Sequence, residues 1–388
     1  MIPNPALGVF FHWLGGLASG SFYVPYRGVK RWAWETYWLA GGFFSWIFAP
    51  WVLGSLMTRD LLAVLSETPS KTLFWSFFFG LLWGVGGLTF GLTMRFLGLS
   101  LGMAVALGLC AAFGTLMPPI FSGVFVSQVL GTSSGRVVLL GIFFCLLGIA
   151  AAGLAGIYKE HAMSPEQRTA TIKEFDLKKG LAVATLSGVM SACFAYGLAA
   201  GAPIKALTLK HGTPTLWQGL PVLVVVLIGG FTTNFLWCLA LNIKNKTGYQ
   251  YFTSDPTRYT PVIDEIIVET AIDAPSREMT EHIPSAKKDD QRAVPMLSNY
   301  LFCALAGTTW YFQFFFYTMG ETQMGKYGFS SWTLHMASII IFSTLWGLGL
   351  KEWKGAGTAA MRLLAAALLL LVGSTVIVGY GNYLGLAR

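Results

Sequence analysis

The sequence predicts an all-α polytopic membrane protein with ten transmembrane helices, arranged as two inverted five-helix repeats. Three observations lead to this fold class: a strongly apolar composition, ten apolar runs of membrane-spanning length, and short patterns that recur in both halves. Of the 388 residues, 54% are hydrophobic and 11% are charged, and the mean hydropathy is +0.60. Such a composition is typical of a chain folded in a bilayer rather than around a soluble core.

Ten apolar windows define the predicted helices. An α-helix rises about 1.5 Å per residue, so roughly 20 apolar residues cross the hydrocarbon core. Windows of this kind occur at residues 7–25, 35–57, 73–96, 99–121, 136–157, 179–200, 216–243, 297–319, 328–350 and 359–384. We therefore expect ten spans with connections between them that are mostly short.

Lys and Arg residues are distributed unevenly between the two sides of these windows. Nineteen of the 26 lie in the odd-numbered connections, and seven lie in the even-numbered connections and at the two ends. Cytoplasmic connections carry the excess of Lys and Arg in membrane proteins. The sequence thus predicts cytoplasmic odd connections and both termini outside. Its net charge of +8 needs no nucleic acid as a partner.

Two connections divide the predicted chain. Residues 1–157 form the first repeat, residues 158–178 a cytoplasmic connection, and residues 179–388 the second repeat. The second repeat is interrupted at residues 244–296 by a hydrophilic cytoplasmic loop, which holds nine of the eighteen Asp and Glu residues. The loop has too few apolar residues for a core of its own, so we expect a linker rather than a folded domain.

Short patterns recur in the same order in both halves. The pattern GxxSxxF occurs at residues 16–22 and 188–194, and an aromatic run that begins with Trp occurs at residues 83–90 and 310–317. Five helices per half is an odd number, so the second half must enter the membrane with the opposite orientation. Inverted repeats of this kind are typical of alternating-access transporters.

The eighth window carries the first candidate binding residues. Trp310, Gln313 and Tyr317 stand at i, i+3 and i+7, so they share one helix face. An amide in hydrocarbon costs free energy unless it meets another helix or a wet cavity, and aromatic rings beside an amide suit a neutral sugar. The alternative is that Gln313 forms an interhelical hydrogen bond and the aromatic rings only pack.

Residues from three other windows complete the predicted pocket. Trp83 would add another aromatic face, and Ser191 and Asn234 would meet sugar hydroxyls. An interhelical bond explains Asn234 equally well. We expect a central cavity lined by the first, third, sixth, eighth and ninth helices, with no metal and no cofactor.

Two histidines are the leading candidates for proton coupling. His12 and His335 lie a few residues below the outer ends of their helices, at similar depths. Imidazole titrates near neutrality, and ionisable residues inside a membrane mark proton and ion pathways. Glu35, at the cytoplasmic start of the second helix, is the next candidate. Each of the three also has a purely structural explanation: a hydrogen bond across helices for the histidines, and an interfacial carboxylate at a helix start for Glu35.

Motifs along nearly all the predicted helices resemble one known family. They are GVFFH at residues 8–12, FYVP at 22–25, KRWAWET at 30–36, GLTMRFLG at 91–98, FDLKKG at 175–180, WYFQFFFY at 310–317, SWTLHM at 331–336 and LKEW at 350–353. Together they are similar to the L-rhamnose–proton symporters of bacteria, in the drug/metabolite transporter superfamily. The resemblance implies ten helices, a bacterial inner-membrane location and uptake of L-rhamnose driven by protons. The connection at residues 244–296 is longer than the family pattern.

The sequence therefore predicts a secondary active transporter, which takes up L-rhamnose or a related neutral sugar with protons by alternating access. Its partners would be the sugar, the proton and the lipid bilayer. An exporter or exchanger of another small metabolite is the alternative within transport, because one fold hosts many functions. An integral-membrane enzyme is disfavoured, because the sequence shows no mid-helix carboxylate pair, metal-ligand cluster or nucleophile motif.

Overall fold

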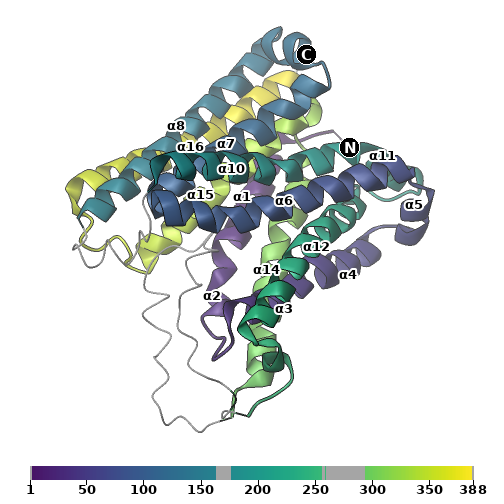
Figure 1. Ribbon diagram of the computed structural model, residues 1–388. Coiled ribbons are helices and arrows are strands. Elements are labelled where there is room, and N and C mark those ends of the chain that lie inside the picture. Colours follow the sequence, from purple (N-terminus) through teal and green to yellow (C-terminus); the bar gives the residue numbers. More distant parts are fainter. Residues whose placement is uncertain (1, 163–175, 256–257, 259–292, 387–388) are drawn as a thin grey trace.

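The structure is a computed structural model that describes residues 2–162, 176–255, 258 and 293–386. Every regular element in these ranges is helical, and Figure 1 shows the helices packed into one bundle. Eight of the described helices are long and apolar enough to cross a membrane. The predicted class of an all-α, multi-pass membrane protein is confirmed at this level.

Helices occupy all ten predicted windows. In the first half they are α1 (Pro5–Ser21), α3 (Trp34–Gly42) followed by the π-helix η1 (Phe43–Phe48) and α4 (Ala49–Met57), α6 (Ser70–Leu97), α7 (Leu99–Phe121) and α8 (Ser133–His161). In the second half they are α10 (Leu177–Ala200), α12 (Leu220–Asn245), α14 (Met296–Glu321), α15 (Ser331–Gly349) and α16 (Gly357–Leu386). Shorter helices lie in the connections: α2 (Tyr23–Tyr26), α5 (Leu61–Glu67), η2 (Phe125–Leu130), α11 (Ala202–Lys210), η3 (Thr215–Trp217), η4 (Gly248–Tyr251) and η7 (Gly325–Ser330).

Two of the ten window helices, α1 and α14, are not among the eight candidate spans. α1 has 17 residues, and α14 includes buried polar residues such as Asn299 and Gln313. The two helices pack against each other, and α1 also packs against α15. A helix that contacts protein on several sides needs less apolar surface than one that faces lipid. The membrane crossing of these two helices stays a prediction.

The main packing pairs link one half of the chain to the other. α1 packs against α14 and α15, and α10 packs against α6 and α7. α8 pairs with α16, and Figure 1 shows these two helices side by side. α12 packs on α6 and α3, and α14 also packs on α3. The long helices of the two halves are therefore interleaved rather than segregated.

Glycines on α1 let it approach its neighbours at backbone distance. A Cβ at Gly15 would lie 2.7 Å from the backbone oxygen of Gln313 on α14, and a Cβ at Gly16 would overlap Ser338 on α15. Small residues at such contacts are a general device for close helix packing in membranes. The two glycines thus place α1 directly against the helices that carry the candidate site residues.

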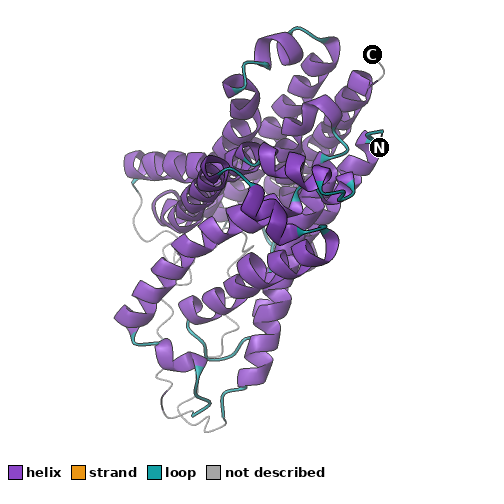
Figure 2. Ribbon diagram, turned by 90° about the vertical axis from the view of Figure 1, so that its right-hand side faces the viewer, coloured by secondary structure: helices purple, strands orange, loops and turns teal. Residues whose placement is uncertain are grey.

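The two termini and the even-numbered connections lie at one end of the bundle. Figure 2 shows the N and C ends close together. Hydrogen bonds at this end run from the Asn4 N–H to Gln323 Oε1 (3.0 Å), from the Arg59 N–H to Thr213 Oγ1 (2.9 Å) and from Asn382 Nδ2 to Ser330 Oγ (3.0 Å). This end is called the terminal end below.

The odd-numbered connections lie at the opposite end, where hydrogen bonds form two sets. One set joins the first connection to the start of α14, through the Lys30 N–H and Asn299 Oδ1 at 2.9 Å. The other joins the start of α7 to the end of α8, through Ser100 Oγ and Glu160 Oε1 at 2.8 Å. The odd and the even connections thus lie at opposite ends of the bundle, as expected for a chain whose successive helices run in opposite directions.

The predicted hydrophilic loop at residues 244–296 is partly folded. Its first residues continue α12 to Asn245 and then form η4, and the Gln250 side chain accepts hydrogen bonds from the Ala33 N–H (2.7 Å) and from Thr36 Oγ1 (2.9 Å). This short segment is held in place because its polar groups pair with the start of α3, and the linker prediction for the loop as a whole stays a prediction. Most of the remaining loop, and residues 163–175 of the connection at 158–178, lie outside the described residues.

Candidate functional site

A central cavity of about 120 Å³ lies between the two halves of the chain. Six of the predicted site residues line it: Trp83, Ser191, Asn234, Trp310, Gln313 and His335. They come from α6, α10, α12, α14 and α15, so the structure brings together residues up to 252 positions apart in sequence. The prediction that the first helix lines the cavity is wrong for the described cavity, because the glycine face of α1 is covered by α14 and α15.

Tryptophans form most of the aromatic wall. Trp83 and Trp310 were predicted, and their ring centroids are 5.8 Å apart. Trp38, Trp46 and Trp332 also line the cavity and were missed. Trp332 lies three residues before His335, so the i, i+3 relation on one helix face was a signal that could have found it. Aromatic faces of this kind suit the apolar C–H surface of a ring-shaped ligand.

The two cavity amides differ in how their polar groups are used. Asn234 accepts a hydrogen bond from Trp38 Nε1 at 3.1 Å and donates to the Gly230 backbone oxygen at 2.9 Å. Gln313 is 4% exposed, and its Nε2 has no hydrogen-bond partner among the described residues. A buried polar group without a partner costs roughly 1–3 kcal/mol. Gln313 is therefore the amide that a ligand hydroxyl would stabilise most.

The two histidines lie on either side of Tyr317. The ring centroids of His12 and His335 are each 5.3 Å from the centroid of the Tyr317 ring. His12 is fully buried, and neither of its ring nitrogens is hydrogen-bonded to a described residue. His335 is 1% exposed, and within the same part of the chain its Nδ1 has no partner. The predicted similarity in depth of His12 and His335 agrees with this arrangement.

Tyr317 and His12 lie behind the cavity rather than on its lining. Tyr317 is 3% exposed and packs against Trp332 with ring centroids 5.9 Å apart. Gly320 leaves the space that His12 needs, because a Cβ there would lie 2.8 Å from His12 Nε2. Tyr317 thus connects the cavity residue His335 to the more remote His12.

Glu35 lies apart from this group. It is 1% exposed, and its Oε1 accepts hydrogen bonds from Asn245 Nδ2 at 3.0 Å and Thr247 Oγ1 at 2.7 Å. Asn245 is the last residue of α12 and Thr247 lies two residues beyond it, so the carboxylate holds the end of α12 against the start of α3. Glu35 does not border the cavity.

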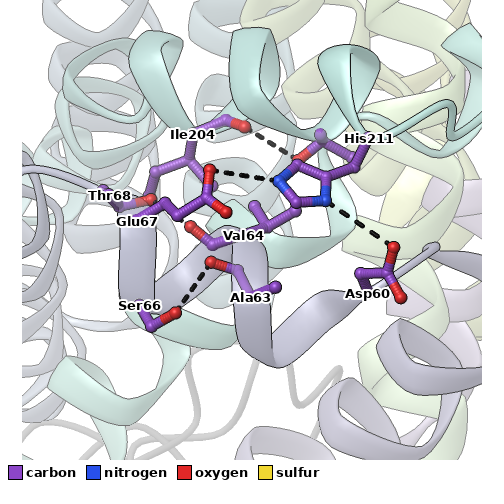
Figure 3. A network of polar contacts seen from close by, with 9 residues as sticks. Asp60, Ala63, Val64, Ser66, Glu67, Thr68, Ile204 and His211 are labelled. Atoms are coloured by element: carbon purple, nitrogen blue, oxygen red, sulfur yellow. Dashed lines mark hydrogen bonds and ion pairs between the residues drawn. The ribbon is translucent and has the colours of Figure 1, made fainter.

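The terminal end of the bundle carries a second polar group, around His211. His211 follows α11, and its Nε2 lies 3.2 Å from Glu67 Oε2 while its Nδ1 lies 3.7 Å from Asp60 Oδ2 (Figure 3). Asp60 directly precedes α5 and Glu67 is its last residue, so the imidazole bridges the connection between α4 and α6 to the connection between α10 and α12. Nearby, Lys205 of α11 forms an ion pair with Glu321 at the end of α14, at 2.7 Å.

The family model and the individual relatives that match this chain all have the same description. Residues 1–263 and 278–384 match the family described as L-rhamnose-proton symport protein. The chain is 35% identical over 379 residues to the L-rhamnose-proton symporters of Yersinia pestis (strain Pestoides F) and Yersinia pseudotuberculosis (serotype O:3), covering 97% of each chain. It is 34% identical over 377 residues to the L-rhamnose-proton symporter of Cronobacter sakazakii, again covering 97% of each chain. The chain therefore belongs to the L-rhamnose-proton symport protein family, a family of transporters rather than enzymes.

Proposed function

We propose that this protein takes up L-rhamnose together with protons across the bacterial inner membrane, by alternating access. The family supports this function, and the carrying observation is the unpartnered amide of Gln313 beside the Trp83 and Trp310 rings. An amide can donate to one hydroxyl and accept from another, while the indole faces cover the C–H side of a pyranose ring. The combination fits a neutral sugar that carries a methyl group.

The fold proposed for this function has ten spans in two inverted repeats, as in the drug/metabolite transporter superfamily. The packing supports this arrangement, because equivalent helices of the two halves make equivalent contacts. α1, the first helix of one half, packs on α14 and α15, which are the third and fourth helices of the other. α10 likewise packs on α6 and α7, and the two fifth helices, α8 and α16, pack on each other. A chain with internal two-fold symmetry makes this reciprocal set of contacts.

The repeated sequence pattern supports the same relation. Gly16 of the first copy meets Ser338 of α15, and Gly188 of the second copy meets Ala106 of α7, where an added Cβ would lie 2.7 Å from the backbone oxygen. The contacted helices are the fourth helix of the opposite half in both cases. We propose residues 1–157 and 179–388 as the two repeats.

Within the proposed cavity, each predicted residue has a distinct part. Trp83 and Trp310 cover the sugar ring, Gln313 binds hydroxyls, and Ser191 offers one further hydroxyl group. Asn234 acts mainly by fixing the cavity wall, because both ends of its amide are bonded to the protein. These assignments would favour a sugar with a methyl group in place of the usual hydroxymethyl group, because the cavity is largely apolar.

The proposed proton route runs from His12 through the Tyr317 ring region to His335 at the cavity. Tyr317 carries a hydroxyl that can donate and accept, and it lies between the two imidazoles. His335 contacts Tyr317 and also lines the sugar site, so a change in its protonation would change the charge at the cavity wall. Glu35 remains the alternative proton group, nearer to the opposite end.

We further propose that the terminal end faces outside and that the structure is closed there. The first turns of α12, Leu220–Leu227, are buried on all sides, and the His211 bridge and the Lys205–Glu321 ion pair join three connections above them. The excess of Lys and Arg in the odd connections places the opposite end in the cytoplasm.

One experiment tests the function directly. Purified protein in proteoliposomes should accumulate L-rhamnose when the outside is made acidic, and a protonophore should abolish the accumulation. Binding of L-rhamnose should be tighter than that of other neutral sugars in a calorimetric panel. Binding without proton-dependent accumulation would favour the alternative, an exchanger or exporter of a small metabolite.

A further inference from the structure

The second membrane helix is not a regular α-helix. Between α3 and α4 the backbone forms the π-helix η1, Phe43–Phe48, and Trp46 lies within it. Single π turns inside α-helices occur frequently at functional sites, because the extra residue per turn re-aims the side chains around it. Trp46 is one of the cavity-lining residues that the sequence did not indicate.

The local geometry explains where the Trp46 indole lies. A Cβ at Gly42 would lie 2.5 Å from Cζ3 of Trp46, so the indole rests against the backbone of Gly42, four residues earlier. From there it reaches the centre of the aromatic wall, with ring centroids 5.6 Å from Trp310 and 6.0 Å from Trp38. Any other residue at position 42 would displace the ring.

The indole N–H of Trp46 differs from those of Trp38 and Trp332, two other tryptophans of the cavity. The Trp38 N–H donates to Asn234, and the Trp332 N–H donates to the backbone oxygen of Cys110 at 3.1 Å. Trp46 is 3% exposed, and no described residue accepts a hydrogen bond from its Nε1. A buried N–H without an acceptor is costly, so a ligand oxygen beside it would be stabilised.

We propose that Trp46 is a sugar-binding and specificity-determining residue, whose N–H donates to one oxygen of the bound L-rhamnose while its ring closes the wall beside Trp310. The π-helix and Gly42 position this donor. The proposal rests on the proposed function and deepens it. Together with Gln313 and His335, Trp46 gives the cavity three residues with an unpartnered hydrogen-bonding group among those described, and Trp46 is the one on the first half of the chain.

A second, smaller void beside Trp46 offers a competing explanation. It has a volume of about 10 Å³ and is lined by Gly42, Ser45 and Gly307 as well as by aromatic residues shared with the main cavity. Such a void holds at most about one water molecule. If the indole N–H served only that water, Trp46 would contribute to stability and not to sugar selection, and the two cases differ in measured affinity.

The test removes the N–H, together with part of the ring system in one variant and alone in the other. Trp46→Phe, and a variant with benzothienylalanine at position 46 that keeps the indole shape, are compared with wild type by calorimetry. The probes are L-rhamnose and a set of its analogues with one hydroxyl at a time replaced by fluorine. We expect both variants to bind L-rhamnose roughly 5- to 100-fold more weakly. One analogue, the one without the hydroxyl that Trp46 binds, should bind wild type as weakly as L-rhamnose binds the variants. Its affinity should not fall further in the variants.

Trp13 supplies the matched control. Its indole N–H is also buried without a partner among the described residues, but it packs against Phe342 and does not border the cavity. Trp13→Phe should leave the affinity unchanged. Equal binding of L-rhamnose by wild type and both Trp46 variants, or an equal loss for every analogue, would overturn the role of Trp46. Failure of wild type itself to bind L-rhamnose would instead contradict the proposed function.

Discussion

The indole N–H of Trp38 donates a hydrogen bond to the side-chain oxygen of Asn234 at 3.1 Å. The nitrogen of the same amide donates to the Gly230 backbone oxygen at 2.9 Å. Asn234 therefore joins α12 to α3, whereas Gln313 keeps a nitrogen that no described residue binds. Of the two amides in the cavity, one stabilises the wall and the other is available to a ligand.

Gln313→Ala should weaken L-rhamnose binding by about 1–3 kcal/mol, because a sugar hydroxyl then loses its partner in a buried site. Isothermal titration calorimetry of the purified protein measures this change. Asn234→Ala should act differently: it breaks the contact between α3 and α12, so we expect a lower melting temperature and a smaller loss of affinity.

Gln323→Ala is the control for the Gln313 variant. Gln323 is another buried amide, 1% exposed, but its oxygen accepts from the Asn4 N–H at the terminal end of the bundle. Its replacement should leave the affinity for L-rhamnose unchanged. If Gln313→Ala binds as tightly as wild type, Gln313 is a packing residue.

His12→Gln should abolish proton-driven accumulation of L-rhamnose and spare sugar counterflow. A proton moving inward releases about 2.3 kcal/mol per 100 mV, enough to concentrate a neutral sugar roughly fiftyfold. Counterflow needs sugar binding and alternation only, and His12 does not border the cavity. His335→Gln should also abolish accumulation, and it should weaken binding because His335 lines the sugar site.

Sugar-induced alkalinisation of lightly buffered cells measures the proton movement in these variants. His161→Gln, at the exposed last residue of α8, provides the control and should transport like wild type. If both His12→Gln and His335→Gln still accumulate sugar against a gradient, the proton group lies elsewhere. Glu35 would then be the first residue to replace.

The predicted orientation can be tested with introduced cysteines. The five native cysteines are free and buried, so background labelling should be low. A reagent that cannot cross the membrane should label Ile2→Cys, at a residue 88% exposed, in intact cells. It should label Lys354→Cys, in an odd connection, only after lysis. The reverse pattern would place both termini in the cytoplasm.

His211→Gln should loosen the closure at the terminal end. The substitution removes the imidazole, whose two ring nitrogens contact Asp60 and Glu67 in the bridge of Figure 3. Partly exposed contacts of this kind contribute about 0.2–1 kcal/mol each, so the loss of both should raise the population open at that end about two- to thirtyfold. The labelling rate of Ser191→Cys in the cavity, by a reagent added outside, measures this population.

Lys210→Gln changes a neighbouring charge and leaves the bridge intact, so it serves as the control for His211→Gln. Equal labelling rates in the two variants would contradict a role of the His211 bridge in closure. The bridge would then stabilise the fold and have no part in opening.

The ten helical windows could be predicted because a run of about 20 apolar residues is itself the requirement for a membrane helix. The short helices α5 and α11, with seven and nine residues, could not, because they lie in connections and carry no membrane-length signal. The π-helix was also missed. Its hydrogen-bond pattern depends on how Gly42 and Trp46 pack, which no local residue pattern reveals.

The candidate site could be predicted in part. Trp310, Gln313 and His335 reach the cavity because helix periodicity fixes which residues share a face, and polar residues in apolar windows are few. Tyr317 and Glu35 were assigned parts that depend on distances across helices. Those distances follow from tertiary packing, and the structure places Tyr317 between two histidines and Glu35 at the end of α12.

The glycine face of α1 has a mechanical consequence. Where Gly15 and Gly16 meet α14 and α15, α1 contributes backbone alone, so a small displacement of α1 requires no rotamer of these two residues to change. A knobs-into-holes interface resists such a displacement until its side chains disengage. His12 lies on the same helix and contacts Tyr317 of α14, so a shift of α1 at these glycines would also change the surroundings of the imidazole.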